Sequence, residues 1–424
     1  MDIPTKSNYI KYKDKNENLF VNKNAILKRF EAVRTETESL IKNLSAEDLC
    51  LQGMVEASPP KWHLAHTNWF FEAIILTPHK SNYKVYNKRW NYLFNSYYDF
   101  FGERHSREER GILTRPLTSE ILKWRKHVDT ELKEFIENLI NPNLHIFNII
   151  ELGLQHEQQH QELLLMDLLD GFSRNPLEPV YSFDFKDIEK NQNYNKNWVE
   201  FESGLREIGA IHRDANYSPK KFYFDNETPR HKTFIEPFRF ASELVTNISY
   251  KHFINDGGYQ KPQYWMSEGW HLKDINKWQC PRYWIKNVEN NEYEWEFSLN
   301  GRKNIEDLKP VRHINWFEAD AFARWAGARL PTECEWEIAV ESNNIDIMQS
   351  HNSLWQWTSS PYSPYPGFKR IDGALGEYNG KFMSSQLVLK GSSYLTPISH
   401  QRNTYRNFFY PLNRWMASGI RLAK

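Results

Sequence analysis

The first 170 residues carry a helical hydrophobic pattern. In residues 25–44, apolar side chains recur every three or four positions, and residues 120–140 repeat this spacing. A third stretch, residues 58–76, places two prolines directly after Ser58, which predicts a helix start with Ser58 as the N-cap. Residues 144–169 contain no proline and consist of good helix formers. Four helices of this length predict an up-down four-helix bundle.

The pattern changes near residue 195. Turn-forming sequences such as DNETPRH, NDGGY and SPYSPYPGF alternate with short β-rich runs, and helical stretches become brief. We therefore expect an α+β multidomain protein with a mobile N-terminus at residues 1–20. A four-helix bundle should follow at residues 21–175, then a polar linker at 176–198 and an irregular α+β domain at 199–424.

Composition excludes some classes of partner. The 424 residues include 54 Lys and Arg and 54 Asp and Glu, so no nucleic acid or anionic membrane is expected as a partner. No apolar run approaches 18 residues, which argues against a membrane span, and the first 20 residues do not read as a secretory signal. Cys50, Cys280 and Cys334 lack zinc-site spacing and do not suggest disulfides. We expect a cytoplasmic protein, and its oligomeric state is not readable.

Two histidines in an apolar helix are the first sign of chemistry. His156 and His160 are four residues apart and therefore share one helix face. A metal site needs a third ligand, and the helix at 58–76 offers His63 and His66. Facing helices of a bundle could thus supply three imidazoles, with positions left open for substrate and, if the metal is iron, for O2.

The same residues also spell H-E-x-x-H, the zinc-peptidase pattern. In that alternative Glu157 is the general base, and a further ligand is required. The metzincin extension is absent, and a carboxylate such as Glu178 lies in the expected linker. A non-catalytic module in which the histidines hold a structural metal is a third alternative.

Four stretches carry a resemblance to a known family: SPPKWHLAHTNWFFE, FNSYYDFFGERHSREERG, LGLQHEQQHQELLLMDL and RNTYRNFFYPLNRW. They resemble the sulfoxide synthases of ergothioneine biosynthesis, which are non-haem iron enzymes. The first half is similar to a DinB-like four-helix bundle. The second half is similar to the C-type-lectin-like fold of formylglycine-generating enzyme, also called sulfatase-modifying factor.

The resemblance implies a metal and a reaction. By its motifs, His66, His156 and His160 bind Fe(II), whereas His63 falls outside the ligand positions and Glu157 has no role as a base. The implied reaction uses O2 to join the sulfur of a cysteine-type thiol to the imidazole C2 of hercynine (N-α-trimethylhistidine), and the product is a sulfoxide. Histidine in place of hercynine, or a selenium donor, remains an alternative. We expect no methyltransferase domain after Lys424, and this expectation favours hercynine.

The resemblance also implies substrate contacts. Gln159 and Asn407 match positions that hold hercynine. Arg107 and Arg110 match an R-x-x-R pair that contacts the carboxylates of the thiol, and a guanidinium suits this task. Tyr365 belongs to a Tyr-x-x-Tyr pair near the iron and is expected to contact substrate.

The catalytic tyrosine stays open between two segments. Tyr362, the first residue of the Tyr-x-x-Tyr pair, matches a position whose phenol supplies a proton or electron to the reaction. In another branch of the family the paired tyrosines of N-S-Y-Y, here Tyr97 and Tyr98, do this work. The chain contains both sets.

The thiol donor is expected to be L-cysteine. Members that use γ-glutamylcysteine carry Trp-Asp after the Arg-Asn of the C-terminal motif, where this chain has Phe408 and Phe409. Without that carboxylate, a glutamyl ammonium group loses its partner. We also expect the two phenylalanines to shrink and dry that end of the pocket.

Overall fold

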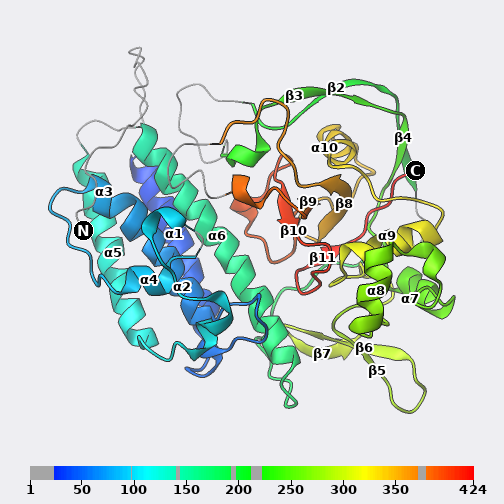
Figure 1. Cartoon of the computed structure of the whole chain (residues 1–424), viewed down its shortest axis with the longest axis horizontal. Helices are drawn as coiled ribbons and strands as arrows, with labels where there is room; N and C mark the ends of the chain where they lie inside the picture. The colour runs from blue at the N-terminus through cyan, green and yellow to red at the C-terminus, as the bar shows by residue number, and fades with distance from the viewer. Residues whose placement is uncertain (1–22, 97, 140–143, 192–196, 212–221, 371–378) are drawn as a thin grey trace.

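The computed structural model describes residues 23–96, 98–139, 144–191, 197–211, 222–370 and 379–424. Figure 1 shows the helices of the first half on one side of the molecule and the strands with shorter helices on the other. The long helix α6 (Leu144–Ser173) lies between them. This arrangement confirms the predicted α+β class. The expected mobile N-terminus, residues 1–20, lies outside the described residues.

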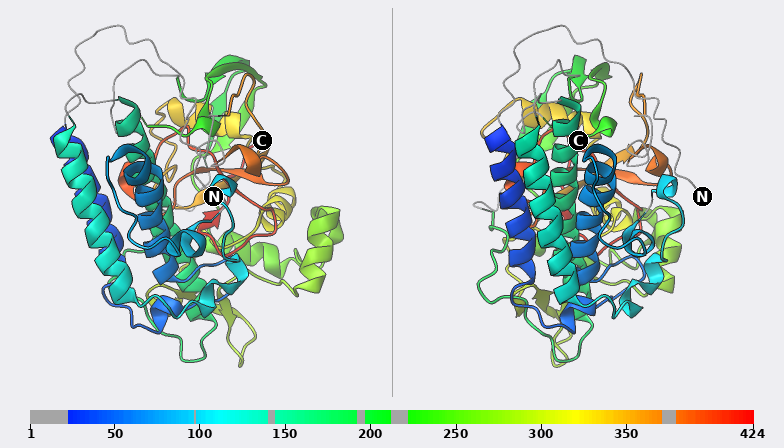
Figure 2. Two further views of the ribbon diagram at one scale, coloured as in Figure 1. Left: turned by 60° about the vertical axis from the view of Figure 1, so that its left-hand side comes forward. Right: turned by 90° about the vertical axis from the view of Figure 1, so that its left-hand side faces the viewer.

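Four helices form the first domain and run side by side in Figure 2. They are α1 (Lys23–Ile41), α2 (Pro60–Phe70), α5 (Thr118–Asn138) and α6. The apolar positions that predicted α1 and α5 are buried, including Phe30 and Val128. The predicted bundle is therefore confirmed, and its helices form because each one buries an apolar stripe.

The start of α2 differs from the prediction by one residue. Pro59, not Ser58, is at the N-cap, and Pro60 is the first helical residue. Because Pro60 follows it, Pro59 is kept out of the helical region, and it adopts φ −60° and ψ 147°. Ser58 is left outside the helix, where its backbone N–H donates to Asp167 of α6.

Short helical pieces connect the long helices. They are η1 (Asp48–Cys50), the π-helical η2 (Phe71–Leu76), α3 (Thr77–His79), α4 (Trp90–Phe94), η3 (Asp99–Phe101) and η4 (Arg107–Ile112). The π-helical turn continues α2 directly into α3. Within the part of the chain that is described, no helix is long and apolar enough to cross a membrane.

The second domain is built from short strands and short helices. A four-stranded sheet has the order β10-β9-β8-β11, a three-stranded sheet has the order β5-β6-β7, and β1 pairs with β4 and β2 with β3. The strands are β1 (Trp198–Phe201), β2 (Gly204–Ile208), β3 (His231–Ile235), β4 (Phe238–Ala241), β5 (Trp284–Lys286), β6 (Tyr293–Ser298), β7 (Gly301–Asn304), β8 (Trp355–Pro361), β9 (Leu387–Gly391), β10 (Asn407–Phe409) and β11 (Ser418–Gly419). The helices are α7 (Asn247–Asn255), α8 (Ser267–Ile275), α9 (Trp316–Trp325) and α10 (Glu333–Glu341).

Capping boxes start two of these helices. The Asn315 side chain accepts from the backbone N–H of Glu318 at the start of α9, and Glu318 accepts from the backbone N–H of Asn315. Thr332 and Glu335 do the same for α10. Each box satisfies two backbone donors that the first helical turn leaves free. Local sequence therefore explains helices as short as nine residues.

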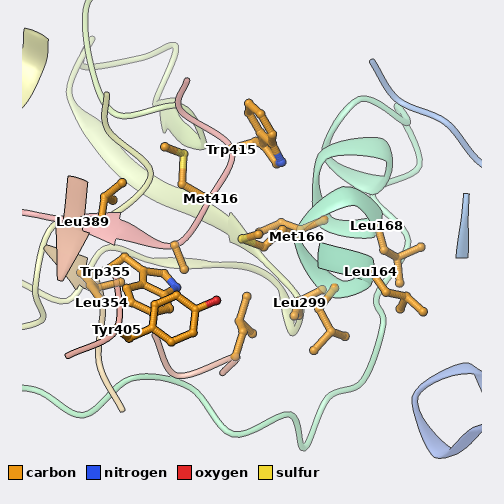
Figure 3. Close-up of a cluster of buried hydrophobic side chains, with 14 of the residues drawn as sticks. Leu164, Met166, Leu168, Leu299, Leu354, Trp355, Leu389, Tyr405, Trp415 and Met416 are labelled. Atoms are coloured by element: carbon orange, nitrogen blue, oxygen red, sulfur yellow. The ribbon is translucent and has the colours of Figure 1, made fainter. Parts of the chain in front are cut away.

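One hydrophobic cluster joins the two domains through α6. In Figure 3, Met166 lies on the side of α6 that faces Trp415 and Met416 of the second domain, whereas Leu164 and Leu168 lie on the opposite side. All five side chains are buried. Because apolar burial is the main stabilising force in folding, α6 belongs to both cores at once.

The expected linker, residues 176–198, packs along the second domain where it is described. Ile188 is buried, and the Asp187 carboxylate accepts from Arg312 Nη1 at 2.6 Å and from Lys309 Nζ at 2.9 Å. The charges of these two side chains lower the pKa of Asp187 even though burial raises it. The polar residues of this segment thus form specific contacts.

Candidate metal centre

Helices α2 and α6 bring three histidines together. His66 comes from α2, and His156 and His160 come from successive turns of α6. Each offers a ring nitrogen, and the three nitrogens lie within 4.8 Å of one another. The i, i+4 spacing places two rings on one helix face, and the contact between α2 and α6 supplies the third. These are the three residues for which the sequence predicts metal binding.

The geometry suits one ion. Phe94 presents its carbonyl oxygen 2.6 Å from His66 Nδ1, which identifies Nδ1 as the donor and leaves the lone pair on Nε2. His66 Nε2 lies 3.2 Å from His156 Nε2. Two imidazole nitrogens bound at about 2.1 Å and roughly 90–109° apart would be about 3.0–3.4 Å from each other. The pair is thus spaced as ligands of a shared cation, and the donor set fits iron or zinc.

Burial keeps these histidines neutral. It lowers the pKa of His66 and of His160 well below the usual value, and it lowers the pKa of His156 to about 3. Neighbouring histidines lower the pKa of His66 and His160 further. At neutral pH each ring therefore has a lone pair for a metal, which is the form that binds.

His63 lies beside the triad without belonging to it. Its Nδ1 is 2.8 Å from His160 Nδ1, and its Nε2 is 3.1 Å from Asp167 Oδ2. Both ring nitrogens of His63 are therefore engaged by protein groups. The sequence offered His63 and His66 as alternatives, and the structure groups only His66 with the α6 pair.

Glu157, the presumptive base of a zinc peptidase, lies inside the bundle. It is fully buried and accepts from Arg34 Nη1 at 3.0 Å, from Arg125 Nη2 at 2.9 Å and from Thr37 Oγ1 at 2.7 Å. Burial raises the pKa of Glu157, but the two guanidinium charges lower it more. A carboxylate held in this way by α1 and α5 is not available as a base, so the zinc-hydrolase interpretation loses its central residue.

Aromatic rings surround the histidines. Trp62 stacks on His66 with centroids 4.5 Å apart, and Trp69 stacks on it at 5.6 Å. Phe70 packs on His156 at 4.8 Å. Tyr98 contacts Trp69 and Phe70 and is fully buried, so one layer of rings separates it from the triad. Tyr97, the other predicted tyrosine of this segment, lies outside the described residues.

The two predicted arginines have different surroundings. Arg107 is exposed, whereas Arg110 is buried and donates to Ser58 Oγ at 2.8 Å. Its guanidinium carbon lies 3.4 Å from the ring centroid of Trp62, the residue that stacks on His66. Among the described residues Arg110 has no ion-pair partner, and its Nε has no acceptor. Burial and the charge of Arg107 lower the pKa of Arg110, so an anionic ligand would be favourable there.

Gln159 connects α6 to the second domain. Its Nε2 donates to the phenol oxygen of Tyr405, which also lies 3.2 Å from His400 Nε2. His400 Nδ1 lies 2.5 Å from Gln155 Oε1 on α6. This chain of contacts sets the orientation of the Gln159 amide. Tyr405 and His400 are not among the predicted site residues, although Tyr405 lies within the stretch RNTYRNFFYPLNRW.

The three predicted residues of β10 face different ways. Asn407 Oδ1 accepts from the backbone N–H of Phe408. Phe408 stacks on Tyr362 with centroids 4.1 Å apart, whereas Phe409 packs on Trp415 at 5.7 Å. Successive strand residues point to opposite faces, so the two phenylalanines cannot close one end of a pocket together, as the sequence led us to expect.

The Tyr-x-x-Tyr pair belongs to the second domain. The Tyr362 hydroxyl accepts from Asn226 Nδ2 at 2.8 Å, and the Tyr365 hydroxyl donates to Glu333 Oε2 at 3.2 Å. Burial raises the pKa of both phenols. Among the described residues, no hydrogen bond or ring contact joins either tyrosine to the three histidines. Tyr98, by contrast, contacts Trp69 and Phe70, which in turn pack on His66 and His156.

Comparison with known proteins agrees with this architecture. Residues 29–164 match the DinB superfamily, and residues 184–343 match the sulfatase-modifying factor enzyme 1-like domain. A hercynine oxygenase of Mycolicibacterium smegmatis is 29% identical over 246 residues, which cover 47% of this chain and 55% of the relative. The hercynine oxygenase of Mycobacterium tuberculosis is 29% identical over 244 residues, with coverage of 47% and 55%.

The second domain has a further relative. Formylglycine-generating enzyme of Streptomyces coelicolor is 33% identical over 126 residues, which cover 27% of this chain and 40% of that protein. The chain spans about half the length of the curated hercynine oxygenases that it matches. The chain is thus similar to the hercynine oxygenases, and it combines a helical bundle that matches the DinB superfamily with a following domain that matches the sulfatase-modifying factor enzyme 1-like domain.

Proposed function

We propose that this protein is an Fe(II)- and O2-dependent enzyme that joins L-cysteine to hercynine. The reaction would form a bond between the cysteine sulfur and the imidazole C2, with one atom of O2 entering the sulfoxide and the other leaving as water. The observation that carries the proposal is the buried triad of neutral imidazoles from α2 and α6. Similarity to hercynine oxygenases supports the choice of substrates.

His66, His156 and His160 would hold the iron. A bound Fe(II) supplies the redox chemistry with O2 and an affinity for the thiol sulfur. The surrounding rings of Trp62, Trp69 and Phe70 exclude water from the histidines. Excluding water from the site also limits side reactions once both substrates are bound.

Arg110 would bind the carboxylate of cysteine. Its guanidinium is already oriented by Ser58 Oγ and by the face of Trp62, and it lacks a carboxylate partner among the described residues. An arginine–carboxylate pair fixes the substrate as well as attracting it. Arg107, which is exposed, would serve the entry of the anion.

Gln159 would orient hercynine. Its Nε2 donates to Tyr405, and this contact would hold the amide of Gln159 beside the imidazole of the substrate. Asn407 would contact the same substrate from β10. Holding both reactants in a fixed orientation lowers the entropic part of the barrier.

A tyrosine would supply the proton. The candidates are the N-S-Y-Y segment, whose Tyr98 packs on Trp69 and Phe70, and Tyr362, whose hydroxyl accepts from Asn226 and keeps its own proton to donate. Tyr97→Phe and Tyr98→Phe, compared with Tyr362→Phe, would separate the two segments by the yield of sulfoxide.

The test is a product analysis. The protein is loaded anaerobically with Fe(II), mixed with hercynine and equal amounts of cysteine and γ-glutamylcysteine, and then exposed to air. We expect the mass of hercynylcysteine sulfoxide, with none from zinc-loaded protein. The γ-glutamyl product would keep the reaction and refute the donor. No sulfoxide from iron-loaded protein, with both thiols unchanged, would refute the proposed reaction.

A further inference from the structure

His160 has a second ring nitrogen, and a histidine faces it. If Nε2 of His160 is directed to a metal, its Nδ1 carries the proton of the neutral ring. The only hydrogen bond described for that Nδ1 is the 2.8 Å contact with His63 Nδ1. One proton must lie between these two nitrogens, so His160 is the donor and His63 the acceptor. This assignment follows from the hydrogen-bond network.

Asp167 completes the series. With Nδ1 of His63 acting as acceptor, its proton is on Nε2, which lies 3.1 Å from Asp167 Oδ2. His63 and Asp167 are both buried. Asp167 follows His160 by seven residues, which is about two helical turns, so both side chains project from the same face of α6. The carboxylate thus favours one tautomer of His63, and His63 favours one tautomer of His160.

The same carboxylate contacts the start of α2. Asp167 Oδ2 also accepts from the backbone N–H of Ser58 at 2.8 Å, and Ser58 Oγ accepts from Arg110 Nη1 at 2.8 Å. Asp167 is therefore connected through His63 to His160 of the triad, and through Ser58 to the arginine to which we assign the thiol carboxylate.

We propose that Asp167 is a positioning residue that, through His63, directs Nε2 of His160 to the metal, and that Ser58 extends this arrangement to Arg110. The inference rests on the proposed function in so far as His160 is taken as a ligand. Groups that orient a metal-binding histidine from behind commonly change metal affinity or activity roughly 10–100-fold when they are replaced.

The experiment measures metal binding, which does not require turnover. Apo-protein is titrated anaerobically with Fe(II), and the visible spectrum of Co(II)-loaded protein reports ligand geometry. We expect Asp167→Asn and His63→Leu each to weaken Fe(II) binding roughly 10–100-fold and to change the Co(II) spectrum. His63→Asn, whose amide oxygen lies near the position of Nδ1, should recover part of the loss. The double variant should bind no more weakly than His63→Leu alone, since both changes break one series of contacts.

Asp170→Asn is the matched control. Asp170 is a fully buried carboxylate on the same helix, and it accepts from Arg282 Nε at 2.9 Å. It should lose thermal stability as Asp167→Asn does but keep wild-type Fe(II) affinity. If Asp167→Asn and His63→Leu bind Fe(II) as Asp170→Asn does, the proposal is wrong.

Ser58→Ala tests whether Ser58 extends the arrangement to Arg110. It should raise the KM for cysteine with Fe(II) affinity unchanged, and an unchanged KM would refute this role of Ser58. Metal binding and sulfoxide formation are scored separately. Wild-type protein that binds Fe(II) and responds to these variants but makes no sulfoxide would overturn the proposed function and leave the positioning role intact. Wild-type protein that binds no divalent metal would overturn both.

Discussion

Two of the buried glutamates of helix α6 have opposite surroundings. Glu157 faces the bundle and is held by Arg34 and Arg125, whose charges lower its pKa despite burial. Glu162 faces the second domain, where burial raises its pKa although Trp355 Nε1, Ser393 Oγ and Thr396 Oγ1 donate to it. The two residues are five positions apart on one helix.

The difference separates two kinds of interface. Buried ion pairs hold the bundle side of α6, and removing one partner of such a pair strongly destabilises the folded protein. Around Glu162 the second-domain side uses uncharged donors, and replacing one of them alters less. An ion pair joins α6 to the second domain only farther along the helix, between Asp170 and Arg282, among the described residues. The three histidines belong to α2 and α6 within the bundle, so the rigid interface supports the metal. The more adjustable interface, with Gln159 and Tyr405, would then hold substrate.

The largest effect should come from the metal ligands. His66→Ala removes one of three imidazoles, and we expect Fe(II) binding and sulfoxide formation to fall below detection. The bound iron per protein, measured after anaerobic loading, checks this. His252→Ala, a change at an exposed histidine of α7, is the control and should bind iron normally. Full activity in His66→Ala together with loss of activity in His63→Ala would show that the ligand set is wrong.

Replacing Glu157 should destabilise the bundle side of α6. Glu157→Ala leaves two buried guanidinium groups without their carboxylate, and we expect the free energy of unfolding to fall by about 3–5 kcal/mol. Urea denaturation of apo-protein measures this, with the exposed Glu137→Ala as control, expected within about 0.5 kcal/mol of wild type. A catalytic base would give the opposite result, with stability unchanged and only activity lost.

The lowered pKa of Glu157 also predicts that the protein loses stability in acid. Because its pKa in the folded protein is lowered, its stabilising contribution is complete above the unfolded value of 4.5 and is lost as pH falls through the folded pKa. The stability of wild-type protein should therefore drop below about pH 4.5 more steeply than that of Glu157→Gln. Parallel pH profiles of the two proteins would show that the ion pairs contribute nothing.

Local patterns predict the bundle and the pair His156 and His160, and the family resemblance adds His66, but neither predicts the surroundings of the triad. The apolar spacing of α1, α5 and α6 and the i, i+4 histidines are properties of single helices, so the sequence contains them. Glu157 reads as a peptidase base because its partner Arg34 is 123 positions away. Asp167 could have been noticed by its seven-residue spacing from His160, but no spacing reveals that His63 lies between them.

The contacts of the second domain are harder to predict for the same reason, because they join residues far apart in the sequence. Tyr362 and Tyr98 match motifs equally well, and only packing distinguishes them. Tyr98 contacts Trp69, which stacks on His66, whereas the Tyr362 hydroxyl contacts Asn226. The sequence suggests that Phe408 and Phe409 act together, whereas strand geometry directs them to opposite faces. Short strands between loops take their positions from distant contacts that a single sequence does not display.

The second-domain side of the site should allow the thiol substrate to be changed. Phe409→Asp restores the carboxylate that γ-glutamylcysteine users carry, on the same strand face as Asn407. A charge-assisted hydrogen bond is worth about 1.5–3 kcal/mol, so kcat/KM for γ-glutamylcysteine relative to cysteine should rise about tenfold or more. Phe408→Asp, one residue away on the opposite face, is the matched control and should lack this gain. Fe(II) affinity should be unchanged in Phe409→Asp, and a gain in Phe408→Asp instead would show that the faces are assigned wrongly.

The smallest effect should come from Glu162. Because its folded pKa is raised, its contribution to stability is complete below the unfolded value of 4.5 and is lost as pH rises through the folded pKa. Glu162→Gln keeps the shape and an acceptor oxygen but has no charge to bury. We expect its free energy of unfolding at pH 7 to equal or exceed that of wild type by up to about 1 kcal/mol, with a flatter profile above pH 4.5. Urea denaturation at several pH values measures both. A loss as large as that of Glu157→Ala would mean that the second-domain side of α6 depends on charge as much as the bundle side does, and the contrast between the two interfaces would no longer hold.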